Sequence, residues 1–440
     1  MIAPHFAPAK TARCPAYGLF RWPPLSISGY TPTYGSAAIS DNELNSPSHA
    51  ESMQYDGSDF HLTFLIRGLQ MYAIMFSHSF PRRGRCLALL VPIIATAAGS
   101  LFLAGCRTAP RLGSRVARTG DEIMVAGQLF HTGTPVVLWT DPGGYDAYRV
   151  ERRFAPIEES DWETSHEQVR GLRTPNRYGM RKQGLTPEEI ERFRGGGWDL
   201  PALQRMVDEF VIHFDVCGVS RQCFKVLQDY RDLSVHFMLD LDGTIYQTLD
   251  LKERAWQATT ANTRSIGIEI ANMGAYGTNE DNPLADWYTK DADGKVRITI
   301  PPKLGDGGIR TKNFVGHPAR PGLIKGVIQG QELEQYDFTP QQYAALTKLT
   351  ATLCKIFPRI TCDYPKDQNG KLITHKLPDD QLNNYHGVLG HFHVQTDKTD
   401  PGPAFQWDRV IDGARRLLNG GMSEQANEAS LGHMRSNPNQ

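Results

Sequence analysis

The sequence predicts an α/β protein in which helices flank a mixed central β-sheet, with a β-containing addition before it and a long insertion within it. Two observations support this class. From residue 203 onward, short runs of β-branched and apolar residues alternate with segments of helical periodicity, which is the pattern of a sheet covered by helices. The 440 residues are also long enough to bury a substantial core. We therefore expect one elaborated domain over residues 203–418.

The addition, residues 121–200, is expected to contain strands before a helix. The apolar runs in EIMVAGQLFHTGTPVVLWTD are cut by Gly127 and by the segment 133–135, so two short strands joined by a turn are expected. Thr186 and Pro187, followed by two glutamates, supply a cap, a first-turn proline and acidic residues at the positive end of a helix. They predict one short helix here.

The elements of the main domain follow from periodicity. An apolar run over 210–212 has the composition of a buried strand and ends at His213. Thr339 and Pro340 open a helix whose apolar residues recur at helical spacing until Pro358. The other elements expected are a helix over 220–230, strands over 234–240, 244–249 and 265–271, and a last helix over 405–418.

The charge balance excludes one class of partner. Lys and Arg number 47, Asp and Glu number 48, and the net charge is −1. A protein that binds nucleic acid by neutralising phosphates carries a clear excess of positive charge. We therefore expect no nucleic-acid partner.

The segment 86–105 is apolar and free of charge over twenty residues, and Arg82, Arg83 and Arg85 precede it. A basic flank followed by an apolar core is the order of a secretory signal. The residues 103–105 and Cys106 (LAGC) resemble the lipobox of bacterial lipoproteins, in which the cysteine is lipidated and begins the mature chain. We expect a lipoprotein signal peptide over 75–105. The alternative is an uncleaved membrane anchor, which also places the rest of the chain outside the cytoplasm.

The segments around this signal complete the expected organisation. Residues 1–74 are expected to be a non-native or disordered extension, because such signals stand at the N-terminus. Residues 106–120 form a basic tether, and 419–440 a disordered tail. Arg107 after the lipidated cysteine, in place of Asp, is compatible with anchoring to the bacterial outer membrane, facing the periplasm.

Near the end of the chain, the segment GVLGHFHVQTDKTDPGPAF concentrates two histidines, a lysine and two aspartates. Zinc takes imidazole nitrogen and carboxylate oxygen in tetrahedral sites, and catalytic sites leave the fourth position to water. Two His and one Asp would meet this requirement. The ion would then lower the pKa of that water to near 7.

Five segments, in this order, resemble the zinc-dependent N-acetylmuramoyl-L-alanine amidases, whose fold is shared with animal peptidoglycan-recognition proteins. They are VIHFDVCGVSRQC, SVHFMLDLDGTIYQ, RAWQA, SIGIEIA and GHFHVQTDKTDPGPAF. The resemblance covers residues 203–415, broken by an insertion over 277–337. Within the insertion, DWYTKDADGKVRITIPP is expected to form a hairpin, and long ordered insertions near a site often form lids or walls.

The resemblance implies a set of site residues. The zinc ligands are expected to be His213, His391 and Asp400. Glu269 is expected to serve as general base for the attacking water, and a carboxylate in this otherwise apolar strand is costly unless it is paired or used. Lys398 is expected to stabilise the developing oxyanion.

The sequence leaves alternatives for these roles. The stretch between the second and third ligands is one residue shorter than in relatives, so His393 is the runner-up ligand and His386 stands behind it. His236 matches a family histidine that is not a ligand, and packing near the site is its expected role. Gln257 stands where a histidine is usual, and we expect it to alter substrate contacts and to spare the metal.

These residues predict a peptidoglycan hydrolase that cleaves the amide bond between N-acetylmuramic acid and L-alanine of the stem peptide. The expected cofactor is Zn²⁺, and the expected partners are peptidoglycan or muropeptides and, through the lipid, a membrane. The chain is expected to be a monomer. The alternative is a non-catalytic peptidoglycan-binding module, which the presence of Asp400, Glu269 and Lys398 disfavours. A zinc peptidase is disfavoured because no HExxH motif occurs.

The chain has seven cysteines. Cys14 and Cys86 precede the mature protein and Cys106 is the lipidation site, which leaves four. The resemblance implies a disulfide between Cys217 and Cys223, which would fix the loop after the first ligand. For the other two, Cys354 and Cys362, pairing across the end of their helix remains open. An even number suits an oxidising compartment.

Overall fold

The structure is a computed structural model that describes residues 112–161, 177–194, 196–278 and 280–420. The expected extension over 1–74, the predicted signal peptide, the predicted lipidation site Cys106 and most of the expected C-terminal tail lie outside these residues. Among the residues described, no helix is both long enough and apolar enough to cross a membrane.

Within the described residues, six strands form the central sheet, in the order β15, β5, β9, β6, β7, β3. Neighbouring strands run parallel, except β6 and β7, which form an antiparallel hairpin. The bounds are Gly387–Gly390 for β15, Glu209–Phe214 for β5, Ser265–Ile270 for β9, Phe237–Leu239 for β6, Ile245–Gln247 for β7 and Val136–Leu138 for β3. The predicted class, a mixed sheet flanked by helices, is confirmed.

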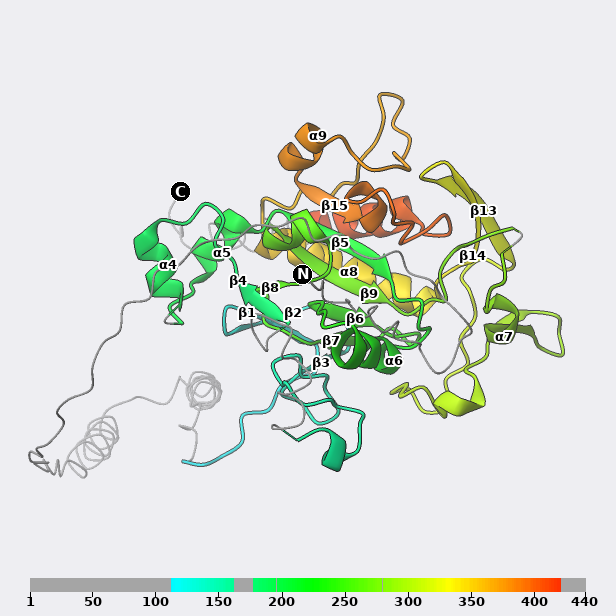
Figure 1. The fold of residues 1–440 in the computed structure, drawn as a ribbon, viewed down its shortest axis with the longest axis horizontal. Coiled ribbons are helices and arrows are strands. Elements are labelled where there is room, and N and C mark those ends of the chain that lie inside the picture. Colours follow the sequence, from blue (N-terminus) through cyan, green and yellow to red (C-terminus); the bar gives the residue numbers. More distant parts are fainter. Residues whose placement is uncertain (1–111, 162–176, 195, 279, 421–440) are drawn as a thin grey trace, which may run out of the picture. The chain divides into compact units, whose positions relative to one another are not determined.

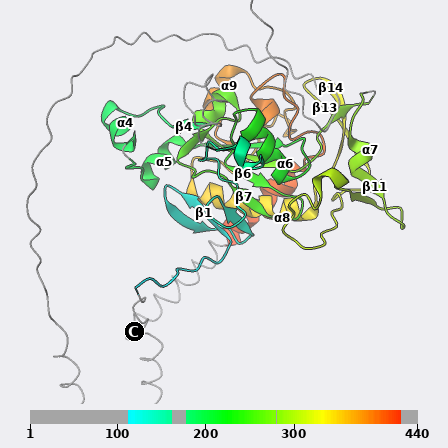
Figure 2. The same ribbon diagram turned by 60° about the horizontal axis from the view of Figure 1, so that its bottom comes forward.

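Helices cover both faces of this sheet. Successive side chains of a strand point to opposite sides, so each strand supplies apolar residues to the core on either face. Phe210 and Ile212 of β5 belong to a core shared with α8 (Pro340–Ile356) and the helix 407–420. On the opposite face, Met238 and Tyr246 pack with α6 (Ser220–Lys225). Figures 1 and 2 show α6 and α8 on opposite sides of the sheet.

The helix α8 begins where the sequence predicts. The hydroxyl of Thr339 accepts a hydrogen bond from the Gln342 backbone N–H at 3.0 Å, and the Gln342 carboxamide oxygen accepts one from the Thr339 N–H at 2.8 Å. This capping box satisfies N–H groups that a helix start would otherwise leave unpaired.

The N-terminal addition joins the main sheet. The predicted pair of strands forms a hairpin, β1 (Glu122–Val125) with β2 (Gln128–His131), and the next residues add β3 to the sheet edge beside β7. Farther on, β4 (Tyr178–Met180) pairs with β8 (Glu253–Ala255). Arg181 follows β4 and is fully buried, and its guanidinium donates to the carbonyls of Leu251, Thr263 and Ser265.

The insertion contains more regular structure than the sequence analysis predicts. The expected hairpin is present as β11 (Tyr288–Lys290) with β12 (Val296–Ile298). A second hairpin, β13 (Leu323–Ile328) with β14 (Gln331–Tyr336), was not predicted, and β14 also pairs with β10 (Tyr276–Gly277). Its two-residue turn, Gln329 and Gly330, has positive φ at both positions (53° and 74°), as a hairpin turn matched to strand twist requires.

Shorter elements connect these parts. The predicted short helix is α4 (Pro187–Arg194), and α6 continues into a π-helical turn, η2 (Val226–Tyr230). The remaining elements are η1 (Ile157–Glu159), α5 (Leu200–Met206), η3 (Thr259–Thr263), α7 (Leu284–Trp287), η4 (Pro302–Leu304), α9 (Asp379–Asn384) and η5 (His391–His393).

The four cysteines in the described part of the chain are thiols and lie in two neighbouring pairs. The side chains of Cys217 and Cys223 interact, and so do those of Cys354 and Cys362. The predicted Cys217–Cys223 disulfide is not formed in this structure. Because its two partners are adjacent, the bond stays a prediction for an oxidising compartment.

Candidate metal centre

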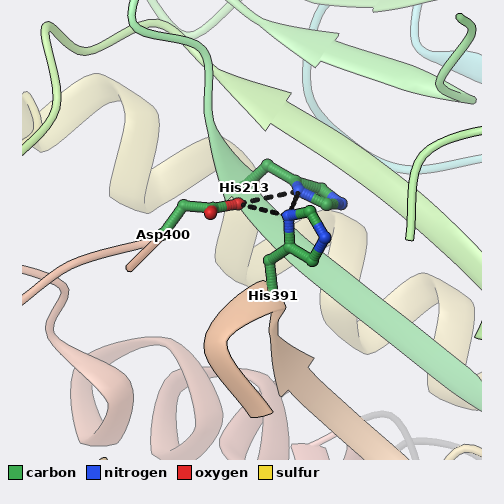
Figure 3. A group of neighbouring side chains, drawn as sticks. All are labelled: His213, His391 and Asp400. Atoms are coloured by element: carbon green, nitrogen blue, oxygen red, sulfur yellow. Dashed lines mark hydrogen bonds and ion pairs between the residues drawn. The ribbon is translucent and has the colours of Figure 1, made fainter. Parts of the chain in front are cut away.

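Three of the predicted site residues converge at one edge of the sheet (Figure 3). The Nδ1 atoms of His213 and His391 lie 3.0 Å apart, and Asp400 Oδ2 lies 2.8 Å from the first and 3.0 Å from the second. All three residues are buried. The structure therefore brings together the proposed ligand set, although 178 and 187 residues separate His213 from the other two.

The sheet topology explains this convergence. β5 and β15 are neighbouring parallel strands, with Ile212 opposite Gly390. Because parallel strands end at the same edge of a sheet, His213 near the end of β5 and His391 just after β15 lie side by side. Asp400 returns to this edge, where its carbonyl accepts a hydrogen bond from the Phe392 N–H at 3.1 Å.

The Nε2 atom of each imidazole, on the far side of the ring from the three converging atoms, contacts a glutamine. His213 Nε2 is hydrogen-bonded to the carboxamide oxygen of Gln257, and His391 Nε2 lies 2.7 Å from the carboxamide oxygen of Gln395. An oxygen acceptor at Nε2 requires the hydrogen on that atom, so the Nδ1 of each neutral ring carries a lone pair.

Two imidazole lone pairs and a carboxylate oxygen thus face a common point. Protonated His391 and His213 would lower the pKa of Asp400 against the effect of burial, whereas neutral rings in the Nε2–H form leave their lone pairs and the carboxylate to a cation. A cation relieves the repulsion among three converging acceptors. In tetrahedral zinc sites the ligand atoms are about 3.3 Å apart, given metal bonds of about 2.0–2.1 Å. The donor set and its spacing therefore fit a zinc ion.

Glu269 lies beside this group. On β9 it stands opposite His213 in the parallel pairing, so the two side chains share one face of the sheet. Burial raises the pKa of Glu269 to about 8, against the opposing effect of His213. Its Oε2 is buried and accepts no hydrogen bond from the described residues. A carboxyl that holds or releases a proton near neutral pH is suited to proton transfer.

Lys398 lies in the loop that leads to Asp400, two residues before it. Its ammonium is 3.5 Å from the carboxylate of Asp397, and its side chain is 18% exposed. The loop thus carries a mostly buried cation next to the third proposed ligand.

The alternative ligands are occupied elsewhere. His393 Nδ1 accepts from the Gly390 N–H at 2.9 Å and its Nε2 donates to the Ile373 carbonyl at 2.7 Å, so neither nitrogen is available to a metal. Burial lowers the pKa of His393 to about 3. His386 precedes β15 and contacts Asp208 at 3.0 Å, at the opposite end of the strands. His236 is fully buried and accepts from the Gly267 N–H at 3.2 Å, in agreement with a packing role.

The insertion supports the ligand-bearing turn. Gln329, at the tip of the β13–β14 hairpin, donates from its carboxamide to the carbonyls of Phe392 and Gln395, both at 2.8 Å. Its backbone N–H donates to Thr374 O at 2.8 Å, and its carboxamide oxygen accepts from the Lys376 N–H at 3.2 Å. The hairpin is therefore bonded to the segment that carries His391.

Three glutamines at the site make contacts that the sequence analysis did not predict. Gln257 was expected to alter substrate contacts, which stays a prediction, and its contact with His213 was not foreseen. Gln395 and Gln329 carried no predicted role. The available signal was weak: Gly330 between two alternating runs is compatible with a hairpin turn, but no local pattern shows which distant group a carboxamide contacts.

Residues 203–403 match the model of a family described as N-acetylmuramoyl-L-alanine amidase. This is the family that the motifs of the same region resemble. Among curated proteins, no sequence matches the chain.

Solved structures with a similar arrangement include amidases at low identity. A selenomethionine derivative of AmpD is 17% identical, with 54% of this chain and 89% of that one covered and a TM-score of 0.25. The amidase AmiD from E. coli, solved with the substrate anhydro-N-acetylmuramic acid-L-Ala-D-gamma-Glu-L-Lys, is 18% identical over 47% and 57%, with a TM-score of 0.26. The Staphylococcus aureus hydrolase AmiA, solved with its ligand, is 11% identical over 56% and 97%, with a TM-score of 0.28.

Proposed function

We propose that the chain is a zinc-dependent N-acetylmuramoyl-L-alanine amidase that hydrolyses the bond between the lactyl group of N-acetylmuramic acid and L-alanine of the stem peptide. The observation that carries the proposal is the convergence of two imidazole lone pairs and the Asp400 carboxylate at 2.8–3.0 Å, within the segment that matches the amidase family.

The proposed roles follow from the positions of the side chains. His213, His391 and Asp400 would hold the metal, which would supply Lewis acidity to a water molecule and to the amide carbonyl. Glu269 takes the proton of the attacking water, whose oxygen bonds to the lactyl carbonyl carbon. When the carbon–nitrogen bond breaks, Glu269 returns the proton to the amine of L-alanine. Lys398 contributes positive charge to the loop next to Asp400, where it would offset charge on the carbonyl oxygen.

We further propose that the mature protein is a monomer anchored to the outer membrane through a lipid on Cys106 and faces the periplasm. The charge-free segment 86–105 and its basic flank support this proposal. Globomycin treatment of expressing cells, followed by electrophoresis, tests the lipid signal. The uncleaved precursor should accumulate, and a Cys106→Ser variant should not be lipidated; normal processing of both would contradict the lipidation.

The activity is tested on isolated sacculi with residues 107–440, purified and loaded with zinc. We expect about one zinc per chain and release of stem peptides with a free L-alanine amino terminus. Metal-stripped protein is the matched control. Zinc-replete protein that leaves the wall and soluble muropeptides intact would overturn the proposal. Binding to sacculi without release would instead favour the non-catalytic module.

A further inference from the structure

The two histidines of the candidate metal centre have the same kind of partner on their far side. Gln257, after β8, contacts His213, and Gln395, after η5, contacts His391. In both cases the carboxamide oxygen faces the ring Nε2. The two glutamines come from segments 138 residues apart in the chain (395 − 257 = 138), so no single turn imposes the repetition.

Neighbouring groups fix which end of each carboxamide faces the imidazole. The Gln257 Nε2 donates to the hydroxyl of Ser265 at 2.9 Å, which leaves its oxygen for His213. The Gln395 Nε2 points to Asp397 Oδ1 at 3.4 Å, and the backbone carbonyl of Gln395 is held by Gln329. The Asp397 carboxylate can only accept a hydrogen bond, and the Ser265 hydroxyl accepts one here, so in this structure the oxygen of each carboxamide is the end that meets the ring.

The sheet leaves room for one of these contacts. Gly267 lies on the same face of β9 as Glu269, two residues away. A Cβ atom at position 267 would lie 2.2 Å from Oε1 and 2.3 Å from Cδ of Gln257. No positive φ requires glycine at this position, and the clash is with the end of one flexible side chain. The absence of a side chain at 267 therefore provides the space in which Gln257 reaches His213.

We infer that Gln257 and Gln395 are positioning residues that hold His213 and His391 as Nε2–H tautomers and so present both Nδ1 lone pairs to a divalent cation. The choice of a neutral carboxamide matters as much as its position. A carboxylate partner makes a ligating imidazole more basic and adds negative charge. With carboxamides, Asp400 is the one charged group among the proposed ligands and their outer partners, so this set leaves a divalent ion with a net charge of about +1.

This inference rests on the proposed metal site, but its first readout needs neither metal nor substrate. In metal-free mature protein labelled with ¹⁵N-histidine, long-range ¹H–¹⁵N spectra distinguish the two tautomers. We expect the Nε2–H form at both His213 and His391, assigned by single His→Gln variants. In Gln257→Met, whose side chain has nearly the same shape and accepts no comparable hydrogen bond, the His213 signals should change while those of His391 stay. Gln395→Met should show the reverse.

The second readout is metal affinity, measured by competition of Zn²⁺ with a chromophoric chelator, together with the absorption spectrum of the Co²⁺-loaded protein. Loss of an outer partner of a ligating histidine typically weakens binding by about 10- to 100-fold. We expect this loss and an altered Co²⁺ spectrum in Gln257→Met, in Gln395→Met and in Gly267→Ala. Gln257→Glu should restore affinity, because it restores the acceptor. The control is Gln341→Met, the same substitution at an exposed position on α8.

The outcomes separate clearly. Unchanged tautomers and unchanged zinc affinity in both Gln→Met variants would overturn the inference. If Gln257→Met lowers the unfolding temperature of the metal-free protein, Gly267→Ala decides: wild-type affinity in that variant contradicts the inference, and loss of affinity supports it. Wild-type protein that binds zinc with these properties and yet leaves the wall intact would refute the proposed amidase activity without touching the positioning role.

Discussion

The two ends of strand β5 carry clusters of similar side chains that differ in how the charge of their aspartate is offset. At the end of the strand, His213 meets His391 and Asp400. At the start, Asp208 meets His386 at 3.0 Å, Arg264 at 2.8 Å and Arg359 at 2.8 Å. Each cluster thus combines a histidine with a buried aspartate, at opposite ends of the neighbouring strands β15, β5 and β9.

The difference is the cation. At the start of β5, two guanidinium groups offset the Asp208 carboxylate, so the cluster is complete within the chain. At the end of β5, the contacts of Asp400 Oδ2 are to imidazole nitrogens that face it with lone pairs. A buried acidic group that has its own arginines supports the fold, whereas one surrounded by other acceptors is arranged to bind a cation.

Substitution of Asp400 should have the largest effect on the end of β5. Asp400→Asn removes the charge that a divalent ion needs, while Asp208→Asn leaves the end of β5 intact. We expect the first variant to lose stoichiometric zinc and to lose activity by about 10⁴-fold or more. The second should keep one zinc per chain. Zinc content by atomic emission and peptide release from sacculi check both, and equal zinc loss in the two variants would show that the ends are not independent.

Glu269→Gln tests whether the proposed reaction needs proton transfer by Glu269 in addition to the metal. The variant keeps the size of the side chain and removes its proton transfer, so it should bind zinc normally and lose about 10²- to 10⁴-fold in turnover. Single-turnover release of the free L-alanine amine is the measurement. Activity within a few-fold of wild type would assign the base role to another group.

Arg264→Met breaks the cluster at the start of β5. Asp208 and Glu209 are buried, and Arg264 is within 2.8 and 3.5 Å of them. Removing one partner of a buried pair typically costs about 3–5 kcal/mol, and the remaining Arg359 should place the loss at the lower end. Urea unfolding checks this value. Zinc affinity of the folded variant should stay unchanged, in contrast to Asp400→Asn.

Glu209, also at the start of β5, should make the free energy of unfolding depend on pH. Burial raises the pKa of Glu209 to about 8, and Arg264 offsets only part of this effect. A carboxyl with a folded-state pKa above its unfolded value contributes stability below about pH 4.5 and loses it as pH rises towards 8. Glu209→Gln cannot ionise, so the fall in unfolding free energy between pH 5 and 8 should be smaller than in wild type by about 2–4 kcal/mol. Parallel slopes for the two proteins would rule out this assignment.

The smallest expected effect concerns the insertion. Gln329→Ala removes the carboxamide that holds two carbonyls of the His391 segment, at a cost of about 1–3 kcal/mol. Because the segment carries a proposed ligand, zinc should dissociate several-fold faster, as measured with a chelator in excess. Gln331→Ala, exposed on the same hairpin, is the control.

The sequence predicted those features that depend on local patterns. The strands at 210–213 and 265–271 and the helix after Thr339 were predictable because periodicity and capping act over a few residues. The ligands were predictable because several motifs occur together. The motifs favoured His391 and left His393 as the runner-up, and the two differ in the structure because the short 3₁₀ turn η5 directs the two rings to different partners. The roles of Gln257 and Gln395 were inaccessible from the sequence, because each is set by a partner far away in the chain.

Arg181 has a consequence for the modularity of the protein. Its buried guanidinium holds carbonyls that border β8 and β9, and β3 closes the edge of the main sheet. A fragment that begins at residue 203, where the family match starts, would expose the edge of β7 and leave these carbonyls without their donor. The segment that matches the family is therefore bonded to the N-terminal addition, and we expect the shortest stable fragment to begin ahead of β1.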